Sequence, residues 1–127
     1  MNWEINLHSS VEKWMLTLAE EDSVSADLVE AAVDMLAEHG PSLGRPLVDR
    51  LTGCRTHNLK ELRPGSSGRT EVRILFVFDS ARQAILLVAG DKAGRWRDWY
   101  DEAIPVAEAR YDEYLAARHG EGKGGGA

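Results

Sequence analysis

Two continuous apolar runs constrain the fold of this chain most strongly. Residues 72–78 read VRILFVF and residues 84–89 read AILLVA, with a short polar turn around Asp79 and Ser80 between them. Runs of this length, rich in β-branched and aromatic residues, are typical of buried strands. Since a tight turn can join only antiparallel neighbours, we expect the two runs to pair in an antiparallel sheet.

Apolar spacing predicts the elements of the N-terminal part. Residues 3–7 alternate apolar and polar side chains, as a short strand does. Two amphipathic helices should follow, one capped by Ser9 or Ser10 and one over residues 26–39. The polar segment EEDS at 20–23, with three acidic residues, should form the turn between them. We expect the two helices to form an antiparallel pair.

The remaining residues predict one more strand and one more helix. Residues 57–62 should form a half-polar strand, and residues 41–53 before it a loop with at most a single turn of helix. The sequence PGSSG at 64–68 is a strong turn signal. Pro105 fits the first turn of a last helix. Successive strands with short connections favour an antiparallel meander.

The element order is therefore β-α-α-β-β-β-α, which defines an α+β protein. Two N-terminal helices should pack on a small, mainly antiparallel twisted sheet, and a C-terminal helix completes the fold. We expect a single domain over residues 1–118. The Gly-rich residues 119–127 offer nothing to bury and are expected to form a disordered tail.

Composition excludes several classes of protein. Cys54 is the only cysteine, so no internal disulfide forms, and a reducing, cytoplasmic setting fits best. No apolar run approaches the roughly 18 residues that span a bilayer, so we expect no membrane partner. The histidines are scattered and no phosphate-binding glycine loop is present. We expect no metal and no small-molecule cofactor.

Charge is distributed very unevenly along the chain. The net charge is −6, yet residues 1–40 hold nine acids and one lysine, and residues 41–100 hold eleven Lys or Arg and six acids. Residues 101–127 are acidic again, with six acids and three basic residues. Because the local field steers an anionic ligand more than the net charge does, a basic middle part favours an anion site there.

Arg73 is the charge that folding explains least. It lies inside the first apolar run, between Val72 and Ile74. A cation in a core strand is costly unless it is paired or opens onto a site. Two interpretations stay open: an ion pair with a carboxylate such as Glu61 or Glu71, or a fixed guanidinium that contacts a phosphate through two hydrogen bonds.

Three more residues lie on the strand expected beside Arg73. Lys60 and Arg63 would be ordinary solvated charges if alone, but next to Arg73 they would stabilise the charge of a phosphoryl transition state. His57 opens the same strand and could carry a proton near neutral pH, although a lone histidine is as well explained as a surface residue.

Basic and aromatic residues alternate just past the last core strand, in the sequence GDKAGRWRDWY at 90–100. Aromatic faces that stack on bases, beside cations that hold phosphates, suit single-stranded nucleic acid. The alternative is that tryptophans here anchor the last helix to the sheet, and we expect one of the two to do so while the other is more exposed. The candidate binding residues are Arg95, Trp96, Arg97, Trp99 and Tyr100, with Lys92 as a further candidate cation.

Four segments, in this order and spacing, resemble the RelE/ParE toxin superfamily. They are LKELRPG at 59–65, VRILFVF at 72–78, ILLVAGDKAGRW at 85–96 and AIPVAEARYDEYL at 103–115. The most similar branch is that of the phage-related HigB-like toxins, in which an L-x-E-L-R strand precedes an R-I strand and a strand that ends in G-x-K. The resemblance covers roughly residues 1–118 and implies a RelE-like fold.

The resemblance implies the toxin of a type II toxin–antitoxin pair, an endoribonuclease that cuts mRNA on the translating ribosome without a metal. The ribose 2′-OH attacks the adjacent phosphate and leaves a cyclic phosphate. The implied partner is a cognate antitoxin, expected to be a helix-turn-helix protein. By position, Arg73 would hold the scissile phosphate and His57 is a candidate general base. The other carried-over residues are Lys60, Arg63 and Lys92 for charge or proton transfer, and Trp96, Trp99 or Tyr100 for base stacking in an RNA-binding edge.

The chain departs from the family pattern in two respects. Its net charge is −6, whereas toxins of the family are usually basic. Lys92 is followed by Ala93 where a second polar or basic residue is common, so one cation is absent unless Arg95 replaces it. Since the ParE branch shares the fold but inhibits DNA gyrase, two alternatives stay open: a gyrase inhibitor of ParE type, and a non-catalytic binding relic of the same fold.

Overall fold

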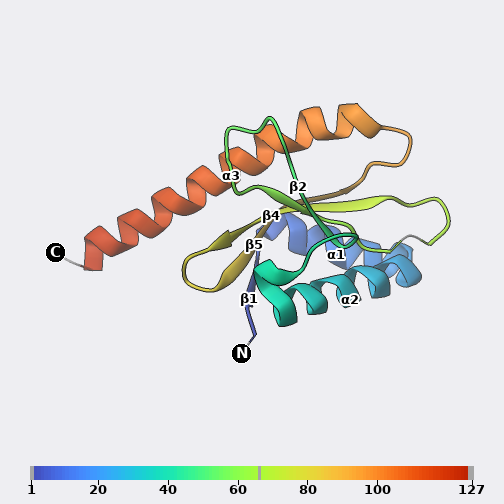
Figure 1. Cartoon of the computed structure of the whole chain (residues 1–127), viewed down its shortest axis with the longest axis horizontal. Helices are drawn as coiled ribbons and strands as arrows, with labels where there is room; N and C mark the ends of the chain where they lie inside the picture. The colour runs from blue at the N-terminus through green and yellow to red at the C-terminus, as the bar shows by residue number, and fades with distance from the viewer. Residues whose placement is uncertain (1, 66, 126–127) are drawn as a thin grey trace.

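The chain folds into three layers, with α1 and α2 on one face of a sheet and α3 on the other (Figure 1). This computed structural model describes residues 2–65 and 67–125, with side chains as far as Arg118. The elements are β1 (Glu4–Leu7), α1 (Ser9–Glu21), α2 (Ser23–His39), the 3-10 turn η1 (Gly40–Ser42), β2 (Val48–Arg50), β3 (Lys60–Leu62), β4 (Val72–Asp79), β5 (Gln83–Asp91) and α3 (Trp96–Gly125).

The sheet has five strands in the order β1-β5-β4-β3-β2. The strand β1 pairs parallel to β5, and the other three pairings are antiparallel. The hairpin β4–β5 is the centre of the sheet, and Arg82 adopts a positive φ of 61° in its turn. The two apolar runs and the β3-β4-β5 meander predicted from the sequence are thus confirmed, as is the α+β class.

Both faces of β4 and β5 are buried, which explains why their sequences are continuous apolar runs instead of alternating ones. On β4, Ile74 and Phe76 pack in the core under α1 and α2. Leu75 and Val77 pack in a second core under α3. All four side chains are 0% exposed, and each burial contributes about 1.5–3 kcal/mol. The register between β4 and β5 shifts between Leu75 and Phe76.

The sequence prediction missed β2, which was expected to be loop. Its three residues are too few to show a period, and the strand exists because Val48 packs in the core and pairs with Leu62 of β3. The single turn of helix expected as the most that this loop could hold is present as the 3-10 turn η1, at Gly40–Ser42. The strand expected over 57–62 is shorter than predicted, because β3 begins at Lys60 and His57 lies in a turn.

The start of α3 was also predicted wrongly. The helix begins at Trp96, and Pro105 lies inside it instead of in its first turn. Proline removes one backbone hydrogen bond in a helix interior, but the helix here is held by Trp99, Ala103 and Ala107, which pack against the sheet. The helix continues to Gly125. Side chains from residue 119 and the whole of residues 126–127 lie outside the described part, and the disordered tail over 119–127 stays a prediction.

Both predicted N-terminal helices form, but α2 begins at Ser23 instead of residue 26, and the cap of α1 differs from the predicted one. The cap of α1 is His8, whose Nδ1 accepts a hydrogen bond from the Ser10 amide at 3.1 Å, so neither serine is the cap. The cap of α2 is Asp22, which accepts from the Ser25 amide at 3.1 Å. Among the described helices, none combines the length and the apolar character that a membrane span requires.

Candidate active site

The candidate site lies on the α3 face of the sheet, where β4 begins and β5 ends. Arg73 shares this face with Leu75 and Val77, because alternate residues of a strand point to the same side. Arg73 pairs with Gly90 of β5. A Cβ at Gly90 would lie 2.5 Å from Nε1 of Trp99, so glycine at this position lets the indole lie against the strand and fix the start of α3 over the site.

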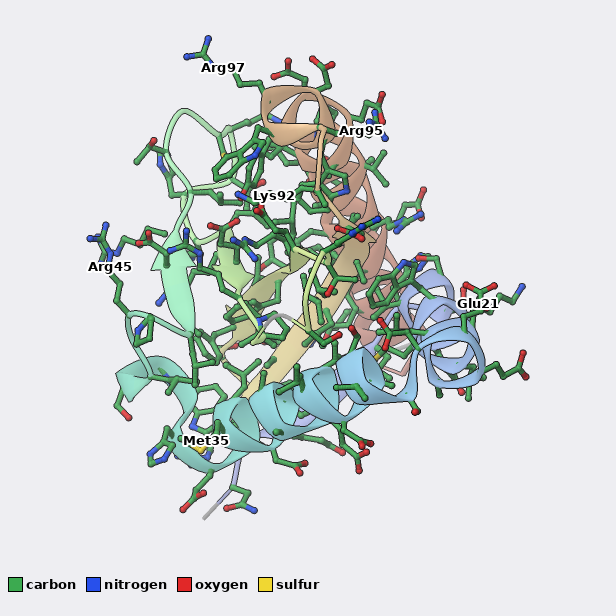
Figure 2. The ribbon with its side chains drawn as sticks, turned by 90° about the vertical axis from the view of Figure 1, so that its right-hand side faces the viewer. Glu21, Met35, Arg45, Lys92, Arg95 and Arg97 are labelled. Atoms are coloured by element: carbon green, nitrogen blue, oxygen red, sulfur yellow. The ribbon has the colours of Figure 1, made fainter. Side chains whose placement is uncertain are left out.

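Lys92 is the buried cation of the site, with only 2% of its surface exposed. Its Nζ lies 3.9 Å from the centre of the Trp96 ring and 5.1 Å from that of Tyr100, both cation–π contacts. Figure 2 shows Lys92 within the molecule, while Arg95 and Arg97 point outward from the start of α3. Burial lowers the pKa of Lys92, and the charge of Arg73 lowers it further.

The guanidinium group of Arg73 is only partly satisfied by hydrogen bonds within the described residues. Its Nη1 donates to the carbonyl of Val72 at 2.8 Å. Its Nε is buried and, among the described residues, has no hydrogen-bond partner. The ion pair with Glu61 or Glu71 that the sequence left open does not form in the described part of the chain. Because buried donors are normally satisfied, this donor is available to an acceptor from outside the chain.

Glu61 completes the site, and the sequence did not single it out as a site residue. It is 5% exposed. Tyr100 donates its hydroxyl to Oε2 of Glu61 at 2.6 Å, and Nε of Arg63 lies 3.4 Å from Oε1. Burial and the Glu61 carboxylate raise the pKa of Tyr100 to about 12, so the phenol keeps its proton at neutral pH. Strand alternation in LKELR places residues 61 and 63 on one face, which is the signal that could have found Glu61.

Among the described residues, no contact joins Lys60 or His57 to Arg63, Arg73 or Lys92. Lys60 points to the opposite face of the sheet, where its Nζ lies 5.3 Å from the centre of the Phe78 ring. Burial lowers the pKa of Lys60, with Arg50 adding to the effect. His57 is exposed in the turn before β3. The structure thus brings Arg63, Arg73 and Lys92 together but adds neither Lys60 nor His57 to them.

The aromatic edge divides as expected between an anchor and an exposed ring. Trp99 is 7% exposed and packs against β5, whereas Trp96 is 60% exposed. Arg95 forms an exposed ion pair with Glu102, with 2.7 Å between Nη2 and Oε1. Arg97 is exposed. The role of Arg95, Trp96, Arg97, Trp99 and Tyr100 in RNA binding stays a prediction.

The arrangement offers three functions within one site. Arg73 and Lys92 can bind an anion, Glu61 can accept a proton, and the exposed Trp96 can stack on a flat group. In the residues described, no three His, Cys, Asp or Glu side chains come together as the ligands of a metal would.

Comparison with known proteins first defines the class. The fold matches that of a free, doubly arginine-to-alanine substituted form of the toxin RelE from E. coli, with a TM-score of 0.58 over 83% of this chain and 97% of that one. Sequence identity to it is 13%, so this match shows the fold alone. The protein therefore has a RelE-like fold.

Sequence comparison then gives the family. Residues 13–112 match the family of phage-derived Gp49-like proteins (DUF891). Two relatives come from Mycobacterium tuberculosis: the putative toxin HigB2, 56% identical over 108 residues, and the putative toxin HigB3, 50% identical over 112 residues. The matches cover 85% and 88% of this chain, but 54% of HigB2 and 93% of HigB3. The chain thus spans about half the length of the first relative. It belongs to the Gp49-like family, and to the HigB-like branch of the RelE/ParE superfamily, as its motifs indicated.

Proposed function

We propose that this chain is the toxin of a type II toxin–antitoxin pair and that it cleaves mRNA on the translating ribosome. The observation that carries the proposal is the buried Nε of Arg73, which lacks a partner among the described residues and lies in one electrostatic cluster with the buried Lys92. A half-buried Arg73 beside the buried Lys92, in an otherwise acidic protein, makes a site for a phosphate. The relationship to HigB-like toxins supports RNA as the molecule that carries it.

The proposed reaction is a transesterification within the RNA. The ribose 2′-OH gives its proton to Glu61 and its oxygen attacks the adjacent phosphorus. The bond from phosphorus to the 5′-oxygen of the next nucleotide breaks, and that oxygen takes a proton from Lys92. The products are a 2′,3′-cyclic phosphate and a 5′-hydroxyl, and the two transferred protons balance. Glu61 retains free lone pairs for this proton, because each carboxylate oxygen has two and Tyr100 and Arg63 contact one oxygen each.

The lowered pKa of Lys92 supports its role as the acid. A proton donor works best when its pKa lies near the working pH, and burial moves Lys92 in that direction. Arg73 keeps its charge and would hold the two non-bridging oxygens as charge develops on them. Arg63 contacts Oε1 of Glu61 and would hold that carboxylate in position.

The site has a natural place for the neighbouring base. Trp96 is exposed and its ring contacts Lys92, so a base stacked on the indole would lie next to the phosphate on the ammonium group. The partners in this proposal are the mRNA, the ribosome and a cognate antitoxin of the helix-turn-helix class, and the site of action is the cytoplasm.

Mapping of RNA ends after brief induction tests the proposal. We expect new 5′-hydroxyl ends within translated codons when the wild-type chain is expressed without its antitoxin. The variants Arg73→Ala and Glu61→Gln should lose these ends by roughly a hundredfold or more. Lys13→Ala, which removes an exposed lysine of α1 on the other face, should cleave as the wild type does.

Two other results would replace the proposal. Intact transcripts with DNA damage signalling would indicate a gyrase inhibitor of ParE type. Harmless expression, with no change in RNA or DNA, would indicate a binding relic of the fold. Cleavage that persists in Arg73→Ala would remove the assignment of the phosphate site while leaving the nuclease activity.

A further inference from the structure

A groove between α1 and α2 forms an apolar hollow on the face of the molecule opposite α3. Its volume is about 350 Å³, compared with roughly 30 Å³ for a water molecule in the liquid, so it can hold several side-chain groups. We call this hollow the α1–α2 groove. Its apolar lining consists of Leu7, Met15, Leu16, Leu18, Ala26 and Val29.

Folding of the chain does not account for the outer part of this groove. Val29 in its lining is 1% exposed and belongs to the core. Leu16 in the lining, by contrast, is 63% exposed, and the lining residues Leu7, Met15 and Leu18 are only partly buried. Single exposed apolar residues are normal on protein surfaces, but exposed apolar residues that line a hollow mark an interaction site.

The surroundings of the α1–α2 groove are strongly acidic. Glu12 and Glu30 are part of its lining. Residues 1–40 carry nine acids and one lysine, and Figure 2 shows Glu21 pointing outward at the end of α1. Hydrogen bonds from Ser25 lower the pKa of Asp22, so the turn between the helices stays charged. A field of this sign repels RNA phosphates and attracts a cationic partner.

We propose that the α1–α2 groove binds a basic amphipathic helix of a partner protein. Apolar residues on one face of that helix would fill the hollow around Leu16, and Lys or Arg on its flanks would pair with Glu12 and Glu30. This combination of an apolar stripe and basic flanks matches both the apolar lining and the acidic rim of the groove. The identity of the partner as the antitoxin rests on the proposed function, while the chemistry of the helix does not.

The position of the groove separates this partner from the RNA site. The helices α1 and α2 cover one face of the sheet, and Arg73, Lys92 and Glu61 lie on the face covered by α3. A helix bound in the groove therefore does not contact the phosphate cluster. Binding at one face and cleavage at the other can be measured independently.

Fluorescence anisotropy with the full chain tests the proposal. The probe is a labelled synthetic helix with Leu at every i, i+3, i+4 and i+7 position and Lys and Arg on the flanks. Two matched peptides serve as controls, one with the same residues in scrambled order and one with Glu in place of each Lys and Arg. We expect the amphipathic basic peptide to bind more tightly than either control by roughly tenfold or more.

Variants of the chain locate the binding site. Leu16→Glu and Glu30→Lys should each raise the Kd of the basic peptide by roughly tenfold, whereas Glu38→Lys, an exposed change on α2 outside the groove, should change it little. Since Leu16 and Glu30 are exposed, the variants should fold normally, which thermal unfolding monitored by circular dichroism would verify. RNA cleavage by Leu16→Glu should equal that of the wild type.

Three outcomes would overturn the inference. One is equal affinity for the scrambled peptide, since charge alone would then explain binding. Another is an unchanged Kd in Leu16→Glu. The third is dimerisation of the free chain that Leu16→Glu abolishes in sedimentation experiments, since the groove would then hold a second copy. If the wild-type chain binds the peptide but cleaves no RNA, the proposed function is wrong, whereas the inference that the α1–α2 groove binds a basic helix is retained.

Discussion

The hydroxyl of Tyr100 on α3 donates to Oε2 of Glu61 on β3, with 2.6 Å between the oxygens. This bond joins the helix to the sheet across the candidate site. It also fixes the direction of the carboxylate, because Arg63 holds the other oxygen at 3.4 Å. If Glu61 is the proton acceptor proposed above, a carboxylate held on both sides loses little entropy when it reacts, so the Tyr100–Glu61 contact should affect both stability and cleavage.

Replacing Tyr100 with Phe should lower both the free energy of unfolding and the rate of RNA cleavage. The variant leaves a buried carboxylate oxygen without its donor, which should lower the free energy of unfolding by about 1–3 kcal/mol. Urea denaturation measures that loss, and RNA cleavage at saturating substrate should fall with it. Tyr111→Phe is the matched control, since Tyr111 stacks on Tyr114 and its hydroxyl has no hydrogen bond among those of the described residues. A Tyr100→Phe variant as stable as Tyr111→Phe would contradict the prediction.

Gly90→Ala should destabilise the protein through Trp99. The new Cβ would lie 2.5 Å from Nε1 of the indole, so the ring and the start of α3 must move. We expect a loss of about 1–3 kcal/mol, together with a red shift of tryptophan fluorescence as Trp99 becomes more exposed. Gly44→Ala is the control, because a Cβ there meets nothing within 4 Å. Equal melting temperatures for the two variants would contradict the prediction, because the start of α3 could then move away from the new Cβ without loss of stability.

Asp79 should make stability depend on pH in the acid range. Burial alone would raise the pKa of Asp79, but hydrogen bonds from Tyr114, from the Ala81 amide and from Arg118 lower it to about 2. A depressed pKa in the folded state means that the stabilisation is full above the unfolded value near 4 and is lost as pH falls toward 2. Because Arg118 is 46% exposed, solvent screening limits this contribution to on the order of 1–2 kcal/mol.

Denaturation curves between about pH 5 and pH 2 measure this effect. The variant Asp79→Asn should be less stable than the wild type at pH 6 and should approach it at the acid end of the range. If the difference between the two proteins were constant with pH, the carboxylate would not carry the stabilisation.

The alkaline limb of the cleavage rate should report Lys92. A general acid must be protonated, so the rate falls as pH rises through its pKa, and burial places that pKa below the ordinary value of 10.5. We expect Lys92→Arg to keep the charge, lose most of kcat and move the alkaline limb to higher pH, because arginine does not deprotonate. Single-turnover cleavage of a model RNA over a pH series measures the limb. An unchanged limb in Lys92→Arg would assign the proton to another group.

The elements that long apolar patterns define were predictable, and those that tertiary contacts define were not. The central hairpin could be predicted because β4 and β5 are buried on both faces and therefore have continuous apolar sequences. The strand β2 was not, because Val48 is its only buried residue and its pairing partner Leu62 is far along the chain. The early start of α3 depends on the packing of Trp99 against Gly90, which is a contact between two segments and leaves no local pattern.

The residues of the candidate site likewise divide into those that a local sequence pattern identifies and those that only the tertiary fold identifies. Arg73 was identifiable because a cation inside an apolar run stands out by itself. Lys60 was predicted to lie beside Arg73 but lies on the other face of the sheet. The prediction assigned both residues to neighbouring strands without considering which face of the sheet each side chain points to. The sequence indicated Glu61 only as a possible ion-pair partner of Arg73. The position of Tyr100 on the folded helix shows that the carboxylate is held inside the candidate site.

The alternation in β3 has a consequence for how this protein can change over evolution. Lys60 and Glu61 are joined by one peptide bond, yet one faces Phe78 on the α1 and α2 side and the other faces Tyr100 on the α3 side. The pairing of Leu62 with Val48 and Ile74 holds this three-residue strand in place. A slip of a single residue would turn a carboxylate into the apolar layer and a leucine into the site. Insertions and deletions should therefore be tolerated in the loops on either side of β3 but eliminated within it, because there one displaced residue disrupts both the core and the candidate site.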